Sequence, residues 1–274
     1  MEIGLRSIRI AGCSDKVTIY FLGDLHYGSG NYNETALKRT IEEIKETPNA
    51  YWIGMGDYGD HIYYTDHRYS PNSMAEAPDV QELREGIMGQ IRKLAKILEP
   101  IQGQCLGILT GNHEEKIANK YHLDATRELG YCLKAPYLGY LSLIRLLVCT
   151  GTMKKSRYSL VIFAAHGTRA PRRSGGKINA VEDSHASYDA DIYAIGHSHG
   201  LVTSKLELRG ISTKGKETRR QRVYIVTSGY LDTSRPGTIN YAEKAVYVQS
   251  PCRSPYVRFW FMVPRNELNL ETTI

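Results

Sequence analysis

Five short apolar runs, each followed at once by a glycine and a polar residue, constrain the fold of this chain more than any other feature. The runs occupy residues 17–22, 51–55, 105–110, 160–165 and 191–195. They have the length of single strands and are rich in β-branched and aromatic residues, a pattern typical of strands that are buried in a sheet. A glycine next to the end of a strand permits a sharp turn, so each strand is expected to end abruptly.

Helix-like segments separate these runs. Residues 33–46, with Asn33 as the N-cap, and residues 79–98 are expected to form helices. Strand–helix alternation predicts an α/β fold built in layers, in which ligands collect at the carboxyl ends of the strands. Later strands are expected at residues 201–208, 221–227, 244–248 and 256–263. We expect them to form a second sheet within one domain that spans residues 1–274, with its core motifs in 17–200 and a strand-rich part in 201–274.

The composition excludes several classes of protein. With 42% hydrophobic and 23% charged residues, the chain is typical of a globular protein rather than a disordered one. Its best apolar run, residues 160–165, is far shorter than the roughly 20 residues of a membrane helix, and residues 1–13 lack the apolar stretch of a signal peptide. Five scattered cysteines without a C-x-x-C pair disfavour a disulfide framework or a structural zinc site. We therefore expect a soluble cytoplasmic protein with no membrane association.

Positive charge is concentrated in two parts of the chain. The net charge is +6, yet the segment between Glu128 and Glu182 has no carboxylate and nine lysines or arginines. A second basic stretch covers residues 205–222 and is densest at residues 219–222. Blocks of one sign favour polyanionic partners, although a solvated surface explains such blocks equally well.

Polar side chains that can bind metal ions follow all five runs. They are Asp24, His26, Asp57, Asn112, His113, His166, His197 and His199. Residues two apart at an extended strand end point the same way, so the D-x-H and H-x-H pairs can each present two side chains to one site. Carboxylate and amide oxygens combined with imidazole nitrogens suit manganese, iron or zinc better than an all-oxygen magnesium site. Any one of these elements alone is common in turns, but five in this order predict a metal centre.

In these motifs the chain resembles the calcineurin-like metallophosphoesterases, whose signature is D-x-H, G-D-x-x-D, G-N-H-E/D, a single His and G-H-x-H. The matching stretches are residues 24–26, 56–60, 111–114, 166 and 196–199. No element of the signature is missing, and the resemblance covers about residues 17–200. It implies a four-layer α/β fold, a two-sheet β-sandwich flanked by α-helices.

The resemblance also implies two divalent metal ions, with manganese as the first choice and iron or zinc as alternatives. The implied ligands are Asp24, His26 and His199 for the first ion, Asn112, His166 and His197 for the second, and Asp57 as the bridge between them. Two ions about 3.5–4 Å apart clamp a phosphate and lower the pKa of a bridging water, so that hydroxide attacks phosphorus in line. The implied enzyme is a metal-dependent phosphoesterase.

Residues beside the implied ligands receive further roles. The resemblance implies that His113 is a general acid or a stabiliser of the transition state, and that Asp60 orients it. Glu114 is interpreted as a residue at the start of a helix that satisfies backbone donors. Protein Ser/Thr phosphatases of the family carry Arg-Gly straight after G-D-x-x-D, whereas here His61 and Ile62 follow. A phosphoprotein substrate is therefore disfavoured, and His61 either contacts the substrate or is an exposed loop histidine.

The substrate class is inferred from the basic loop that follows His166. Arg169, Arg172 and Arg173 lie in this loop and are the candidate substrate-binding residues together with His61. A positively charged cleft beside two metal ions favours a polyanion, so we expect a phosphodiesterase or nuclease that acts on DNA, RNA or a nucleotide. The alternatives are a phosphomonoesterase of small-molecule or protein phosphates, a non-catalytic scaffold of the same fold, and a simple nucleic-acid-binding module. Residues 60–78 are expected to form a long loop, and the oligomeric state is left open.

Overall fold

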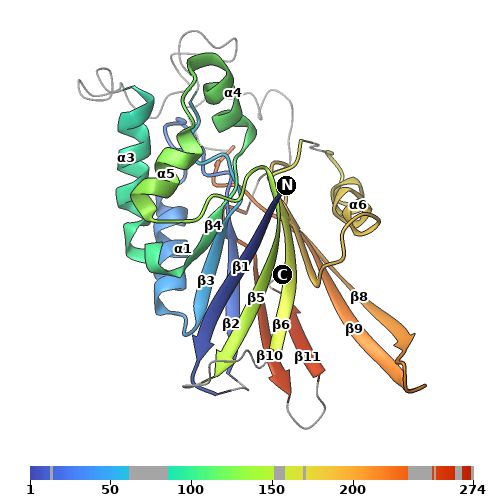
Figure 1. Cartoon of the computed structure of the whole chain (residues 1–274). Helices are drawn as coiled ribbons and strands as arrows, with labels where there is room; N and C mark the ends of the chain where they lie inside the picture. Colours follow the sequence, from blue (N-terminus) through green and yellow to red (C-terminus); the bar gives the residue numbers. More distant parts are fainter. Residues whose placement is uncertain are drawn as a thin grey trace.

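Two mixed β-sheets pack face to face in the computed structural model (Figure 1). It describes residues 1–12, 15–61, 86–150, 158–168, 171–233, 249, 251–262 and 267–272. The strands of the larger sheet are, in spatial order, β1 (Glu2–Ile10), β5 (Leu141–Thr150), β6 (Tyr158–Ala165), β7 (Ile192–Ile195), β9 (Glu217–Val226) and β8 (Val202–Ile211). Strands β6, β7 and β9 run parallel to one another, so their carboxyl ends reach the same edge.

The smaller sheet repeats this arrangement on the other side of the core. Its strands are, in spatial order, β11 (Glu267–Thr272), β10 (Tyr256–Met262), β2 (Val17–Leu22), β3 (Ala50–Gly54) and β4 (Cys105–Ile108). Strands β2, β3 and β4 are parallel, and β10 runs antiparallel to β2. All six residues of β2 are buried, as expected for a strand that is covered on both faces.

Helices complete the four layers. They are α1 (Glu34–Glu46), α3 (Ile87–Leu98), α4 (Asn112–Tyr121), α5 (Ala125–Leu133) and α6 (Ser174–His185), with a 3₁₀ helix, η2 (Glu99–Gln104), after α3. Figure 1 shows α1, α3 and α5 on the outer side of the smaller sheet and α6 on the opposite side of the molecule, against the larger sheet. In the part of the chain that is described, no helix is long and apolar enough to span a membrane.

Buried apolar side chains separate each pair of layers. Between the sheets, Phe21 and Ile53 of the smaller sheet belong to the same core as Ile144 and Ile162 of the larger one. A second core joins α1, α3 and α5 to the smaller sheet, and a third joins α6 to β6, β7 and β9. Burial of this kind stabilises the fold by about 25 cal/mol per Å² of apolar surface, and it holds both sets of parallel strands in register at one edge.

The sequence-based predictions of the core elements are confirmed. All five apolar runs are strands, namely β2, β3, β4, β6 and β7. Helix α1 follows its predicted cap, since the side chain of Asn33 accepts a hydrogen bond from the amide of Ala36 at 2.9 Å. Helix α3 ends at Leu98 as predicted, whereas the first part of the predicted 79–98 helix lies outside the described residues, as does most of the predicted 60–78 loop.

The later strands differ from the prediction in where they pair. They were expected to form a sheet of their own, but β8 and β9 extend the larger sheet and β10 joins the smaller one. The reason is that β9 pairs with β7 and β10 pairs with β2, so each completes a sheet that the earlier strands had begun. The predicted strand at 244–248 lies outside the described residues.

Candidate metal centre

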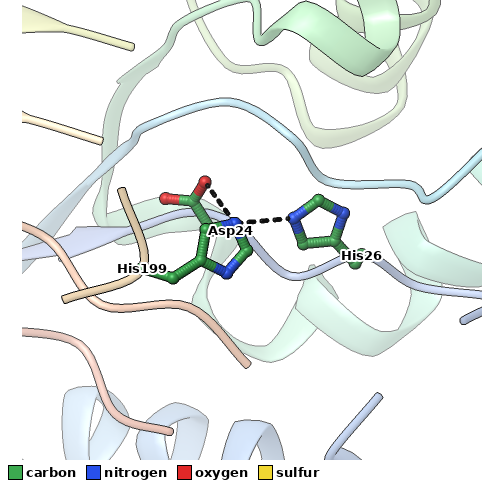
Figure 2. Close-up of side chains that lie close together, drawn as sticks. All are labelled: Asp24, His26 and His199. Atoms are coloured by element: carbon green, nitrogen blue, oxygen red, sulfur yellow. Dashed lines mark hydrogen bonds and ion pairs between the residues drawn. The ribbon is translucent and has the colours of Figure 1, made fainter. Parts of the chain in front are cut away.

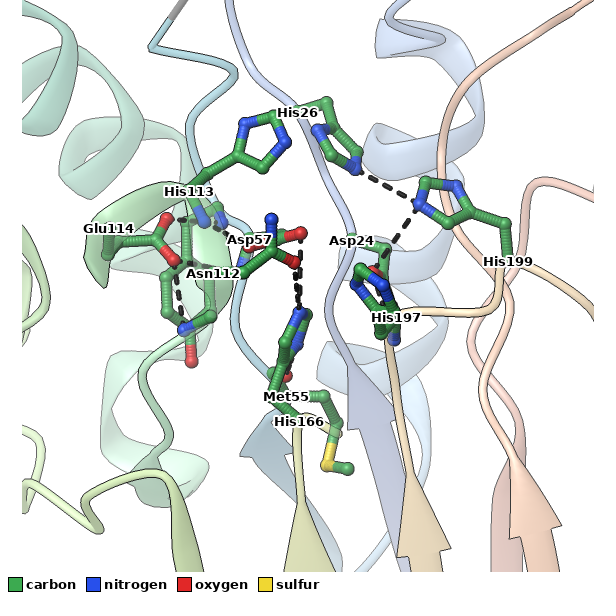
Figure 3. A network of polar contacts seen from close by, with 12 residues as sticks. Asp24, His26, Met55, Asp57, Asn112, His113, Glu114, His166, His197 and His199 are labelled. Atoms are coloured by element: carbon green, nitrogen blue, oxygen red, sulfur yellow. Dashed lines mark hydrogen bonds and ion pairs between the residues drawn. The ribbon is translucent and has the colours of Figure 1, made fainter. Parts of the chain in front are cut away.

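The loops that leave the parallel strands bring the predicted ligands to one edge of both sheets. Figure 3 shows strands rising toward a cluster of carboxylates and imidazoles. The smaller sheet contributes Asp24 and His26 after β2, Asp57 after β3 and Asn112 after β4. The larger sheet contributes the three remaining side chains, His166 after β6 and both His197 and His199 after β7. The centre therefore exists only because the two sheets pack with their carboxyl ends together.

Asp24, His26 and His199 form the first group of potential ligands (Figure 2). Their ligand atoms lie within 4.8 Å of one another. The Nε2 atoms of His26 and His199 are 3.2 Å apart, and Nε2 of His199 is 3.6 Å from Oδ1 of Asp24. Asp24 is completely buried and His26 is 4% exposed. His199 is partly exposed, and two imidazole nitrogens and a carboxylate oxygen that converge in this way suit a shared divalent cation.

Asp57, His166 and His197 form the second group, again with their ligand atoms within 4.8 Å. Nε2 of His166 is 3.3 Å from Oδ2 of Asp57 and 3.1 Å from Oδ1 of Asn112. Nδ1 of His166 lies 2.7 Å from the main-chain oxygen of Met55. A carbonyl only accepts, so this Nδ1 carries the hydrogen and Nε2 faces the other two side chains, the arrangement typical of a metal-binding histidine.

The protonation of these groups follows from their burial and from one another. Burial lowers the pKa values of His197 and His199, so both imidazoles are neutral at pH 7. Burial also lowers the pKa of His166, but the charge of Asp57 outweighs it and raises the value to about 10. Burial raises the pKa of Asp24 to about 6. Nε2 of His166 would have to lose its proton in order to hold a metal ion at the second group.

One unpaired atom supports a cation at the second group. Nδ1 of His197 is buried and has no hydrogen-bond partner among the described residues. A buried polar nitrogen without a partner is costly, and a bound metal ion removes that cost. The residues present thus fit divalent metal ions by their donor types, their burial and this orphaned nitrogen.

Left-handed backbone recurs at the predicted ligands. Positive φ values between 49° and 67° occur at Asp24, His26, Asp57, His197 and His199. Residues other than glycine rarely adopt this region, and each such residue costs on the order of 1–3 kcal/mol. The packing around the loops must hold five strained residues in place, which is a frequent property of functional sites.

Glu114 holds two of these loops together. Its carboxylate is 2% exposed and accepts hydrogen bonds from four backbone amides, those of Asp57, Tyr58, Gly59 and Gly111. The distances are between 2.8 and 3.3 Å. The interpretation of Glu114 as a residue at the start of a helix is correct, since Glu114 caps α4. Glu114 also fixes the loop after β3. The sequence feature that could have predicted the helix cap is an acidic residue at the third position of the helix.

His113 and Asp60 lie together beside the predicted ligands. Nδ1 of His113 is 2.5 Å from the main-chain oxygen of Asp60. The carboxylate oxygen of Asp60 is 3.8 Å from this Nδ1 and only 3.3 Å from Nδ1 of His26. Asp60 therefore orients His113 mainly with its peptide carbonyl, while its side chain faces one of the predicted metal ligands.

The predicted substrate contacts differ in how exposed they are. His61 is 8% exposed and lines a small pocket with Tyr58 and Gln90, so it is not an exposed loop histidine. Burial lowers its pKa to about 4, and it is therefore neutral at pH 7. Arg172 and Arg173 are exposed immediately before α6. Arg169 lies outside the described residues.

The densest part of the second basic stretch, residues 219–222, forms ion pairs within the fold. Arg220 forms ion pairs with Asp189 and Asp191 at 2.9 Å, and Arg222 pairs with Asp189 at 2.6 Å. Arg219 is 3.5 Å from Glu217. The densest basic motif of the sequence is therefore not a free polyanion-binding surface.

Glycine at position 111 is required by the close approach of two loops. A Cβ atom there would overlap the main-chain nitrogen and the carboxylate of Asp57. We expect Gly111→Ala to lower the free energy of unfolding by about 2 kcal/mol, the usual cost of overpacking. Urea unfolding followed by circular dichroism measures it. Gly103→Ala is the matched control, because a Cβ at Gly103 meets no atom within 4 Å; equal loss in both variants would contradict the steric argument.

A comparison with protein families agrees with this geometry. Residues 17–201 match the family model described as calcineurin-like phosphoesterase. A search of the curated proteins finds no match. Among solved structures, Vps29 of Chaetomium thermophilum is similar at 10% identity and a TM-score of 0.37, with 94% of each chain covered. A double mutant of Vps29 from Entamoeba histolytica is similar at 12% identity and a TM-score of 0.31, with 94% of this chain and 98% of that chain covered.

Proposed function

The chain belongs to the calcineurin-like phosphoesterase family, and from this premise we propose that it is a two-metal phosphoester hydrolase. The observation that carries the proposal is the convergence of two mostly buried groups of potential ligands, each with residues from both sheets, at the edge where the sheets end. The family binds two metal ions, and the donor atoms of this chain suit them. Manganese is our first choice, with iron or zinc as alternatives.

We assign the ligands according to these groups. One ion would be held by Asp24, His26 and His199, the other by Asn112, His166 and His197, with Asp57 between them. When bound, the metal ions would neutralise charge on the phosphate and activate water at neutral pH. The assignment is supported by the groups Asp24–His26–His199 and Asp57–His166–His197, two of the three such groups among the described residues, and by Asn112 lying 3.1 Å from His166.

His113 is our candidate for the group that assists the leaving oxygen. Because its Nδ1 faces the main-chain oxygen of Asp60 at 2.5 Å, Nδ1 carries a hydrogen and Nε2 is the nitrogen that can exchange a proton. The ring also packs edge-on against His26, with 4.7 Å between the centroids. Two contacts thus fix the orientation of the imidazole, which is what a proton donor at a reacting oxygen requires.

For the substrate we propose a phosphodiester of nucleic acid or of a nucleotide. The exposed Arg172 and Arg173, a few residues after His166, favour a polyanion beside the metal centre. The test compares kcat/KM for bis-(p-nitrophenyl) phosphate and p-nitrophenyl phosphate in Mn²⁺. A diester preference supports the proposal. A monoester preference replaces it with a phosphomonoesterase, and turnover of neither substrate above the inactive Asp57→Asn variant leaves a non-catalytic scaffold.

The two arginines provide a separate prediction. We expect Arg172→Ser with Arg173→Ser to raise KM for a single-stranded oligonucleotide roughly tenfold, the size for two exposed phosphate contacts of under about 1 kcal/mol each. Hydrolysis of the small aryl diester should stay nearly unchanged. Lys214→Ser with Lys216→Ser removes two exposed charges from the turn between β8 and β9 and serves as the control. Equal losses on both substrates would mean that the arginines do not bind the polyanion.

A further inference from the structure

Lys177 belongs to the carboxylate-free basic segment, yet its side chain is turned into the protein. Its Nζ donates a hydrogen bond to the main-chain oxygen of Ser198 at 2.9 Å. Burial lowers the pKa of this amine, and the side chain is only partly exposed, unlike those of Arg172 and Arg173. Lys177 therefore contacts the turn that carries His197 and His199.

That turn is strained at both histidines. The amide of Ser198 donates to the carbonyl of Gly196 at 2.8 Å, so three residues close a γ-turn with His197 at its centre. With φ of +67° at His197, this is the rare, strained form of the γ-turn. His199 also has a positive φ, of +49°. Such a backbone persists only when its surroundings hold it.

Two contacts restrain the turn, one at the amide of His197 and the other at the carbonyl of Ser198. Ahead of Ser198, the amide of His197 donates to both carboxylate oxygens of Asp24 at 3.1 and 3.2 Å. Lys177 supplies the second restraint at the carbonyl of Ser198, which lies between the two imidazoles in sequence. Figure 3 shows His197 and His199 diverging from this turn, with His199 directed toward His26.

Gly200 leaves room for the ammonium group. A Cβ atom at Gly200 would overlap Nζ and the adjacent carbon of Lys177. The φ of Gly200 is not in the positive range, so what glycine provides there is room for Nζ of Lys177 rather than an unusual backbone conformation. The close fit of Lys177 against Gly200 indicates that this contact is a built feature of the turn.

We propose that Lys177 is a positioning residue of the metal centre, which holds the Gly196–His199 turn so that His197 and His199 point into different ligand groups. This inference rests on the proposed function, in which both histidines bind metal. Lys177 acts through the main chain and does not contact the substrate. Its hydrogen bond also links the first turn of α6, which directly follows Arg172 and Arg173, to the turn after β7.

The test measures Mn²⁺ binding to the metal-free full chain by isothermal titration calorimetry, without any substrate. Lys177→Met keeps most of the side-chain length and removes the donor. We expect Mn²⁺ affinity to fall about 10- to 100-fold, as for other outer partners of metal ligands, with an unchanged melting temperature of the metal-free protein. Lys177→Arg retains a donor and should recover most of the affinity. Lys214→Met, at the exposed turn after β8, is the control.

Each outcome decides the proposal. Unchanged Mn²⁺ affinity in Lys177→Met overturns the proposal. If KM is raised as well, Lys177 is a substrate contact; if it is not, Lys177 is a surface residue. If Lys177→Met does not fold, Gly200→Ala decides instead, because its methyl group displaces Nζ while the charge is kept; it must weaken Mn²⁺ binding as well. A wild-type protein that binds no Mn²⁺, Fe²⁺ or Zn²⁺ refutes the metal centre itself, a result separate from any effect of Lys177.

Discussion

Asp57→Asn is expected to abolish phosphoester hydrolysis while leaving the chain folded. Asp57 is 1% exposed; its Oδ1 accepts the amide hydrogen of His113 at 2.9 Å, and its Oδ2 lies 3.3 Å from Nε2 of His166. Asparagine retains the shape and the Oδ1 acceptor but removes the negative charge at the position assigned to the bridge. Loss of an outer partner of a metal ligand costs about 10- to 100-fold, so loss of the bridging charge should lower kcat by more than about 100-fold.

The measurement is kcat for the aryl diester in saturating Mn²⁺, with far-UV circular dichroism as the check on folding. Asp124→Asn is the matched control, because Asp124 caps α5 in an exposed position and asparagine caps helices equally well. The control should keep wild-type turnover. If Asp57→Asn retained more than about a tenth of the wild-type kcat, the two-metal mechanism would be wrong, since every role given to Asp57 needs its charge.

The parts of this centre that the sequence predicted are those coded by local pattern. A buried strand such as β2 is largely apolar, so the polar residues Asp24 and His26 that follow it stand out in the local sequence. The same holds for His197 and His199 after β7. Packing of the two sheets on one core then brings these strand ends together, and that step followed from the fold class.

What the sequence could not predict are contacts to main-chain atoms of distant segments. Glu114 binds amides of the loop after β3, and Lys177 binds the carbonyl of Ser198. Every residue has the same main-chain groups, so a sequence motif cannot show which of them a side chain will contact. Asp60 shows the same limit, because its spacing did not indicate whether its carboxylate or its carbonyl would face His113.

Charge patterns were misleading for a related reason. The basic run at 219–222 is consecutive in sequence, but its acidic partners, Asp189 and Asp191, come from the segment before β7. Strand β9 pairs with β7, and this register sets Arg220 and Arg222 against them. The charge pattern along the chain therefore overestimated the polyanion-binding surface at residues 219–222, whereas Arg172 and Arg173 are exposed before α6.

Glu114→Gln should cause the largest loss of stability among single isosteric changes at this site. Each carboxylate oxygen accepts two backbone amides, Oε1 those of Tyr58 and Gly59, and Oε2 those of Asp57 and Gly111. An amide side chain replaces one oxygen with an NH₂ group that accepts nothing, so two buried amides lose their partner in either orientation. At about 1–3 kcal/mol for each unsatisfied group, we expect the free energy of unfolding to fall by about 3 kcal/mol.

Thermal unfolding in Mn²⁺ at pH 8.5 measures this effect, which corresponds to a fall in melting temperature of about 6–12 °C for a chain of this size. The pH matters because burial and the charge of Asp57 raise the pKa of Glu114 to about 7, and the carboxylate that accepts four amides is the major form only above that value. Glu115→Gln, one residue further along α4, is the control, since Glu115 is less buried. If both variants melted together, Glu114 would be an ordinary helix cap, and the strained loop of Asp57 would have to be held by its packing alone.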